Sequence, residues 1–345
     1  MSNKNLPAGT VVQAPVVEPP EFALRYSNLA SEEDGASVVA CTDEFFAPVR
    51  RALRATPPVF IAGKFDENGK WMDGWETRRR RGDGHDSAVI RLACPGMVRG
   101  FDIDTTHFTG NYPQAVSIDA CHVSQDPDAH TAWVQVLPVT PVGGDAHHFL
   151  ALQDDRVWTH VRLNMYPDGG VARFKVFGQP WLDWTAQDPS GLHEVSALHA
   201  GGRIVSFNNA HFGTPHRLLM PGRGANMGDG WETRRRREPG HDWCIIELGH
   251  AVHVRQVQID TAHFKGNYPE SVSVQAAQCQ DMTDQLITTS AMFWPELLPR
   301  SPMKGHHEHV FEQEALTRPD PVTHVRVNMF PDGGISRVRI LGTLA

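Results

Sequence analysis

The chain carries the same long sequence blocks twice, and this internal repeat restricts it to folds built from two homologous units. DGWETRRRRGDGHD at residues 73–86 recurs as DGWETRRRREPGHD at residues 229–242, with 12 of 14 positions identical. IDTTHFTGNYP at residues 103–113 recurs as IDTAHFKGNYP at residues 259–269, with 9 of 11 identical. A third block has 10 of 14 positions identical and consists of HVRLNMYPDGGVAR at residues 160–173 and HVRVNMFPDGGISR at residues 324–337.

The spacing of these blocks predicts where the domains begin and end. A length of 345 residues corresponds to about two domains of roughly 150 residues each. The segment GQPWLDWTAQDPSG between the copies is rich in turn residues and tryptophan, so we expect a linker that packs. We predict a flexible N-terminal tail at residues 1–19, a first domain at 20–177, a linker at 178–191 and a second domain at 192–345.

The apolar residues of each copy fall in short runs that are β-branched or alternate with polar residues. Examples are SAVIRL and THVRLNM in the first copy, with WCIIEL and HVRVNM in the second. Runs of this length, separated by Gly, Pro, Asn and Asp, are typical of antiparallel sandwiches. PDGG at residues 167–170 and 331–334 predicts a tight hairpin, because glycine readily adopts a positive φ. We therefore predict an all-β fold of two tandem jelly-roll β-sandwiches, with one short helix near Ala47–Arg54.

Composition excludes several classes of function. The formal charge of −8 gives no broad basic surface for nucleic acid. No run of apolar residues is long enough to span a membrane, and the first twenty residues lack the apolar core of a signal peptide. The five cysteines are far apart and form no CxxC pair, which argues against disulfides or a thiolate zinc site. We expect a soluble cytoplasmic protein with reduced thiols and neither a nucleic-acid nor a membrane partner.

Each copy contains a run of four arginines, at residues 78–81 and 234–237. In an extended segment successive side chains point to opposite faces, so each run divides into two pairs with different surroundings. The planar guanidinium offers paired donors that match a carboxylate, which suits a clamp for a small acidic substrate. Ion pairing with neighbouring acids is the structural alternative. The candidate clamp residues are Arg78, Arg80, Arg234 and Arg236.

Imidazoles lie beside carboxylates in the same repeated blocks. His85 precedes an aspartate, and Asp104 stands three residues before His107, close enough for both to face one cleft. Such groups suit general acid–base chemistry, because histidine titrates near neutrality and a carboxylate can orient it. Polar blocks that end in Gly-Asn-Tyr-Pro also make structural turns, so each histidine has a non-catalytic alternative. The equivalent residues of the second copy are His241, Asp260 and His263.

Further histidines cluster outside the repeated blocks, at residues 147–148 and at 306, 307 and 309. Imidazole is the commonest metal-binding side chain, so a divalent metal is a possible cofactor. The spacing matches no specific zinc motif, and exposed polar loops are the alternative interpretation. The sequence contains no Walker-type loop, no GxGxxG after a strand and no GxSxG elbow. Nucleotide and serine-hydrolase chemistry therefore have no support.

The repeated motifs, together with DEFFAP at residues 43–48, resemble those of the allantoicase family from about Ser27 to Gly342. The resemblance implies tandem jelly-roll domains similar to galactose-binding folds, and a homo-oligomer. It also implies hydrolysis of allantoate to (S)-ureidoglycolate and urea, a step of allantoin degradation that recovers nitrogen from purines. The second copy has NAHFGT at residues 209–214 in place of DEFFAP, so the two copies need not form equal sites.

The implied substrate is a carboxylate whose α-carbon bears two ureido groups, one of which is replaced by a hydroxyl in the product. One route is assisted loss of urea to give an acylimine, to which water then adds. This route needs a carboxylate clamp, an acid and a base, and metal-assisted hydrolysis is the competing mechanism. We assign the clamp to the arginines and proton transfer to His107 or His263. The residues that would orient these groups are Asp104, Asp260, Glu76 and Glu232. Further substrate contacts are assigned to His85, His241, Asn111 and Asn267.

Two other functions are compatible with the pattern. A tandem sandwich can be a non-catalytic carbohydrate-binding module, in which Trp75 and Trp231 would stack on a sugar. A hydrolase of a related ureido acid, such as ureidoglycolate, is the second alternative. The paired acids and imidazoles favour an enzyme over a sugar-binding surface.

Overall fold

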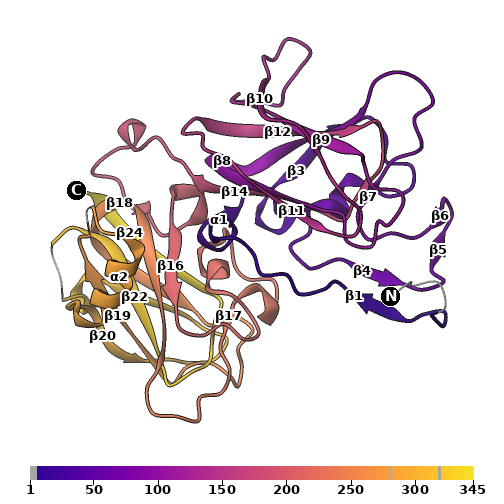
Figure 1. Cartoon of the computed structure of the whole chain (residues 1–345). Helices are drawn as coiled ribbons and strands as arrows, with labels where there is room; N and C mark the ends of the chain where they lie inside the picture. The colour runs from indigo at the N-terminus through magenta and orange to yellow at the C-terminus, as the bar shows by residue number, and fades with distance from the viewer. Residues whose placement is uncertain (1–5, 280, 318–319) are drawn as a thin grey trace. The chain divides into compact units, whose positions relative to one another are not determined.

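The structure is a computed structural model of the chain, and it describes residues 6–279, 281–317 and 320–345. The chain divides into two compact units, Met1–Gln179 (unit 1) and Pro180–Ala345 (unit 2), coloured from indigo to magenta and from magenta to yellow in Figure 1. The described residues contain two α-helices, α1 (Glu21–Arg25) and α2 (Asp284–Ser290). Neither is long and apolar enough to cross a membrane. The predicted all-β class with two tandem sandwiches is confirmed.

One long strand, β8 (Asp86–Asp104), connects the two halves of the unit 1 sheet. Its first half pairs with β3 (Ser37–Cys41) and β12 (Val157–Tyr166). Its second half pairs with β11 (His147–Ala151) and lies next to β14 (Arg173–Pro180). The sheet continues beyond these strands through β9 (Ala115–Cys121), β10 (Val134–Pro141) and β2 (Ser27–Asn28).

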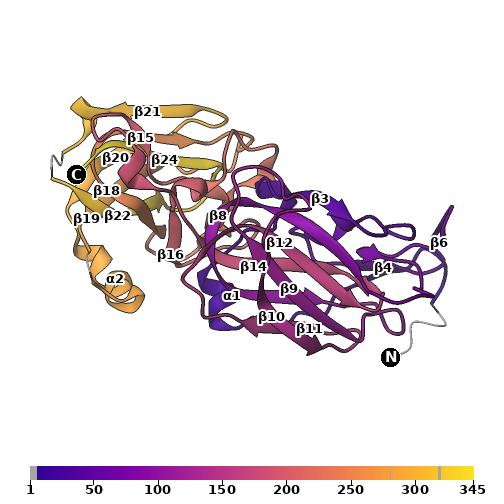
Figure 2. The same ribbon diagram turned by 90° about the horizontal axis from the view of Figure 1, so that it is seen from above.

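Unit 2 repeats this arrangement around β18 (Asp242–Asp260), as Figure 2 shows from above. The first half of β18 pairs with β16 (Arg203–Phe207) and β22 (Val322–Phe330). The second half pairs with β21 (Glu308–Glu312) and β24 (Arg337–Leu344). The remaining strands of this sheet are β15 (His193–Glu194), β19 (Ser271–Ala277) and β20 (Glu296–Pro302).

Alternating burial explains why these segments form strands. In the first half of β8 the side chains of Ala88, Ile90 and Leu92 are buried, whereas Arg91 between them is exposed. Every second residue therefore faces the core, as the pleat of a half-buried strand requires. In the last residues of β8 both faces are buried, so polar side chains at this end, such as Asp102 and Asp104, are enclosed as well.

Four short ladders lie outside the two large sheets. In unit 1, β7 (Trp75–Glu76) pairs with β13 (Gly170–Val171), and in unit 2, β17 (Trp231–Glu232) pairs with β23 (Gly334–Ile335). These ladders hold the start of each arginine run against the PDGG segment. The other two belong to unit 1 and join β1 (Val11–Gln13) to β4 (Val59–Ile61) and β5 (Phe65–Asp66) to β6 (Gly69–Lys70).

Three details differ from the sequence-based expectations. Residues 11–13, within the expected flexible tail, form β1, because their backbone groups pair with β4. The helix expected near Ala47–Arg54 is a 3₁₀ helix over Val49–Leu53. The hairpin predicted at PDGG is wrong, since β12 and β14 are both neighbours of β8 and not of each other. Gly169 does have a positive φ of 151°, and a Cβ there would lie 2.4 Å from the Pro113 nitrogen.

Candidate functional site

The four arginines at residues 78–81 (the first arginine segment) and at 234–237 (the second arginine segment) follow the short strands β7 and β17. The PDGG loop of each unit holds the segment in place. The backbone N–H of Arg80 donates to Asp168 Oδ2 at 2.8 Å, and the N–H of Arg236 donates to Asp332 Oδ2 at the same distance. The repeated arginine block and the repeated PDGG block are thus in contact, which sequence spacing alone did not show.

The third arginine of each segment forms an ion pair with a buried aspartate in both units. Arg80 Nη2 lies 2.9 Å from Asp86 Oδ1, and Arg236 Nη2 lies 2.7 Å from Asp242 Oδ1. The Nε atoms of both arginines are buried and have no hydrogen-bond partner among the described residues, and the same holds for Asp242 Oδ2. The unit 1 pair therefore keeps one polar atom, and the unit 2 pair two, that a bound molecule can satisfy.

The first arginine differs between the units. In unit 1, Arg78 Nε donates to Asp43 Oδ2 at 2.7 Å, and the backbone N–H of Arg78 donates to Asp43 Oδ1. Burial alone would raise the pKa of Asp43, but the hydrogen bonds and charge of Arg78 hold it below its usual value. In unit 2, Asn209 replaces this aspartate, and its side-chain oxygen accepts the backbone N–H of Arg234. Within the described part of the chain, the Arg234 guanidinium has no ion pair.

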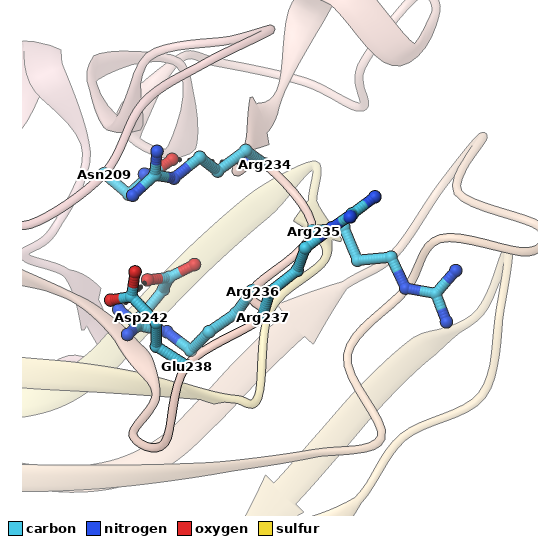
Figure 3. Close-up of a pocket in the computed structure, with 7 residues that line it drawn as sticks. All are labelled: Asn209, Arg234, Arg235, Arg236, Arg237, Glu238 and Asp242. Carbon is cyan, nitrogen blue, oxygen red and sulfur yellow. Dashed lines mark hydrogen bonds and ion pairs between the residues drawn. The ribbon is translucent and has the colours of Figure 1, made fainter.

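A cavity of about 250 Å³ lies beside the second arginine segment. Figure 3 shows Arg234 with Asn209 on one side of it, and Arg236 with Glu238 and Asp242 on the other. The lining residues include four arginines and two acids, so the local charge favours an anion. In unit 1 a cleft beside Arg78 is lined by Asp43 and Glu44, and Asp43 forms an ion pair with that arginine.

The predicted glutamate and asparagine candidates lie together, next to the arginine segments. Asn111 Nδ2 donates to Glu76 Oε1 at 2.7 Å, and Asn267 makes the same hydrogen bond to Glu232. Glu76 stands two residues before Arg78 on an extended segment, so both side chains leave it on the same side. Burial raises the pKa of Glu76, and the hydrogen bond from Asn111 opposes this shift.

His85 and His241 lie next to the buried aspartates but outside the cavity. The ring of His85 makes a 3.3 Å hydrogen bond with Asn164 Oδ1, and the ring of His241 makes a 3.1 Å bond with Asn328 Oδ1. Burial lowers the pKa of His241. His85 and His241 directly precede Asp86 and Asp242 in extended chain, so the histidine and aspartate side chains point to opposite sides. The imidazoles therefore contact the asparagines and not the cavity.

Asp104 is not hydrogen-bonded to His107, nor Asp260 to His263, in the described part of the chain. Asp104 accepts the N–H of Thr106 at 2.8 Å, and Asp260 pairs with Arg223 Nε at 2.9 Å. His107 and His263 have positive φ angles of 71° and 70°, which turn the chain away from the preceding strand. The ring of His263 is bonded to the Gly224 carbonyl at 2.7 Å, and that of His107 faces the Pro58 backbone; burial lowers the pKa of His107.

Both repeated tryptophans belong to the core. Trp75 and Trp231 are fully buried, and their indole N–H groups donate to the carbonyls of Asp43 and Asn209 at 2.8 Å. They cannot stack on a sugar, which removes the feature that favoured a carbohydrate-binding module. Their indole hydrogen bonds fix the backbone of Asp43 and Asn209, the position at which the two units carry different residues.

The histidine clusters make other contacts than the metal ligation considered from the sequence. His148 Nδ1 is bonded to the Ile103 carbonyl and its Nε2 accepts the Gly143 N–H, and His309 repeats both contacts with Ile259 and Lys304. Across residues 6–279, 281–317 and 320–345, no group of three or more His, Cys, Asp or Glu side chains is placed to hold a metal ion. The described cysteines are free thiols.

Sequence reasoning missed Asp43, Asp168 and Asp332 as parts of the site, although all three stand in motifs that it had singled out. The signal for Asp43 was the difference between DEFFAP and NAHFGT, which changes an acid to an amide. It named His147 only as part of a histidine cluster, and not as a neighbour of Asp102 and Asp104. The pairing of β11 with the end of β8 creates this contact, and no local pattern predicts it.

Comparison with known proteins gives a consistent family. The sequence profile of the allantoicase repeat matches residues 27–181 and 193–345. The chain is 55% identical over 329 residues to a probable allantoicase of Rhizobium meliloti and 53% identical over 326 residues to probable allantoicase 1 of Burkholderia mallei; each match covers 94% of this chain and 96% of the relative. The crystal structure of allantoicase from Saccharomyces cerevisiae matches with a TM-score of 0.78 at 30% identity, over 93% of this chain and 95% of that one.

Proposed function

The chain belongs to the allantoicase family, and from this premise we propose that the cavity beside the second arginine segment binds the substrate carboxylate. The protein is accordingly a hydrolase that converts allantoate to (S)-ureidoglycolate and urea, a reaction of allantoin degradation. The observation that carries the location of the site is the Arg234 guanidinium, which faces this cavity with no acidic partner among the described residues.

Arg234 and Arg236 form the clamp in this proposal. They stand two residues apart on an extended segment and line the same cavity, so their donors converge on one anion. Arg236 is held by Asp242 and keeps its buried Nε available, whereas Arg234 is not neutralised. In unit 1 the equivalent Arg78 is already paired with Asp43, so a substrate carboxylate would have to compete with that aspartate.

For the proton transfers we assign carboxylates rather than imidazoles. Asp242 lines the cavity and has a buried oxygen without a partner among the described residues, which can accept an N–H of the retained ureido group and take its proton. Loss of that proton forms the C=N bond of the acylimine as the C–N bond to urea breaks. The oxygen of a water then adds to the same carbon, Asp242 returns its proton to the nitrogen, and the carboxylate that protonated urea takes the proton of the water. We assign protonation of the departing urea to Glu232, which accepts a hydrogen bond from Asn267 and stands two residues before Arg234. We give His107, His263, Asp104 and Asp260 no part in the step, because they neither line this cavity nor adjoin the arginine segment in sequence.

A reciprocal exchange between the units tests this location. Asn209→Asp places a carboxylate beside Arg234, as Asp43 stands beside Arg78, and should raise KM for allantoate. The loss of one charge-assisted contact, about 1.5–3 kcal/mol, corresponds to a decrease of about 10- to 150-fold in kcat/KM. Asp43→Asn is the matched control and should not lower kcat/KM, measured as urea release. A loss in the control with none in Asn209→Asp would place the reaction in unit 1, and no loss in either would refute the clamp.

The same assay distinguishes the competing metal-assisted mechanism. Urea release from allantoate is measured before and after treatment with EDTA, and again after addition of Mn²⁺ or Zn²⁺, with allantoin and ureidoglycolate as control substrates. Activity that survives chelation supports the acid–base assignment. Activity that disappears and returns with the metal would contradict it, and urea from ureidoglycolate would support the related ureido-acid hydrolase.

We also propose that the enzyme works in the cytoplasm as a homo-oligomer without a nucleic-acid partner. The formal charge of −8 supports the absence of nucleic-acid binding. Light scattering coupled to size-exclusion chromatography checks the assembly, because a monomer elutes with the chain mass of 38.3 kDa.

A further inference from the structure

Unit 1 contains a second cavity, of about 460 Å³, that shares no lining residue with the cleft beside Arg78. Its walls are largely apolar and include Val16, Val17, Phe149 and Phe177. The titratable side chains that line it are Asp34, Asp104, His147 and Lys175. None of them belongs to the clamp or to the proton-transfer groups proposed for allantoate.

A buried carboxylate forms the polar end of this cavity. Asp104 is fully buried, and its Oδ1 accepts the N–H of Thr106. Its Oδ2 has no hydrogen-bond partner among the described residues, and the nearest recorded group is His147 Nε2 at 3.7 Å. An ionised oxygen that is removed from water without a donor is unfavourable, so the site favours a ligand that supplies one.

The neighbouring charges are already compensated. His147 Nδ1 lies 3.0 Å from Asp102 Oδ2, and Lys175 Nζ lies 3.3 Å from the same oxygen. The ring of Phe149 stacks on that of His147 at 5.4 Å, which fixes the imidazole. Asp102 therefore has a lysine and an imidazole as partners, whereas Oδ2 of Asp104 accepts no hydrogen bond among the described residues.

Unit 2 shows which chemical group fits this position. The equivalent aspartate is Asp260, which accepts the backbone N–H of Ala262 at 2.8 Å, as Asp104 accepts that of Thr106. Asp260 is also paired with the guanidinium of Arg223, at 2.9 Å from Nε and 3.3 Å from Nη2. Arg223 of unit 2 corresponds to Pro57 of unit 1. The residue before each of them, Gly222 or Thr56, accepts an equivalent hydrogen bond from a buried arginine, Arg337 or Arg173. Unit 1 thus has the carboxylate but lacks the internal guanidinium.

We propose that the unit 1 cavity binds a small planar cation of the guanidinium or amidinium class, which donates N–H groups to Asp104 as Arg223 does to Asp260. The apolar part of such a ligand packs against Phe149, Phe177 and the segment that contains Val16 and Val17. This site is independent of allantoate binding, since the arginine cavity attracts anions and this one attracts a cation.

Titration calorimetry with the full chain tests the proposal, with benzamidine as the probe and its neutral analogue benzamide as the control ligand. Benzamidine should bind with one equivalent per chain, at least tenfold more tightly than benzamide. Asp104→Asn should weaken benzamidine at least tenfold, whereas Asp260→Asn, at the carboxylate already paired with Arg223, should leave its affinity unchanged.

Two further variants keep the test decisive if Asp104→Asn folds poorly. Pro57→Arg supplies an internal guanidinium in unit 1 and should abolish benzamidine binding. Arg223→Ala exposes Asp260 and should raise the stoichiometry towards two. Equal binding of benzamide, or unchanged benzamidine binding in both Asp104→Asn and Pro57→Arg, would overturn the proposal, and so would the absence of binding to the unmodified chain.

Discussion

The buried ion pair between Arg173 and Asp73 gives the sharpest stability prediction. Arg173 is 1% exposed, and its Nη2 donates to Asp73 Oδ2 at 2.8 Å. Its other donors reach the carbonyls of Thr56, Asp73 and Ala172, so one side chain ties three segments of unit 1 together. Removing one partner of a buried pair leaves an uncompensated charge and costs about 3–5 kcal/mol.

We expect Asp73→Asn to destabilise unit 1 by about 3 kcal/mol, near the lower end of that range, because the asparagine carbonyl still accepts a hydrogen bond. For a domain of this size, about 3 kcal/mol lowers Tm by about 6–12 °C. Calorimetry of the full chain measures the transition, with Asp155→Asn as the control. Asp155 pairs with Arg99 but is 92% exposed, and a change within about 2 °C is expected there. The reasoning is refuted if Asp73→Asn lowers Tm no more than this control.

Two other predictions follow from packing and from burial. Gly170→Ala should destabilise unit 1 by about 1–3 kcal/mol through overpacking, because its Cβ would lie 2.1 Å from the Phe108 ring, whereas Gly82→Ala meets nothing within 4 Å and should be neutral in chemical denaturation. Burial raises the pKa of Glu76 in the folded protein. Protonated Glu76 therefore contributes to the free energy of unfolding below the usual pKa of 4.5, and this contribution is lost as pH rises through the pKa of the folded protein. Glu76→Gln should reduce that loss, and stability curves for the two proteins that remain parallel over this pH range would contradict the assignment.

The sequence predicted the sandwich class because the strands keep alternating apolar patterns, as Ala88, Ile90 and Leu92 show in β8. It did not predict that β8 runs unbroken for 19 residues, because Pro95 and Gly96 lie inside it and such residues usually end a strand. The hairpin prediction at PDGG failed for a related reason. A positive φ at Gly169 indicates a turn, but strand order depends on contacts that are distant in sequence.

The candidate site was predictable in composition but not in arrangement. The arginine runs, Glu76 and Asn111 were found because whole polar blocks are repeated, and the structure places them side by side. Whether Arg78 and Arg234 are paired depends on one residue at position 43 or 209, about 30 residues earlier in the chain. The contact of Asp104 with His147 depends on the register of β11 against β8, which local sequence does not encode.

The order of strands in each sheet also sets the timing of folding during synthesis. In unit 1 the first strand of the large sheet pairs with the last, since Asn28 lies opposite Phe177 about 150 residues later, and in unit 2 His193 lies opposite Gly342. At about 5–20 residues per second a ribosome needs about 8–30 s to make that length. For that time the N-terminal strand of a nascent unit has no final partner. A second copy with nearly the same motifs then follows, so completion of unit 1 before unit 2 emerges is what keeps strands of the two repeats from pairing with each other.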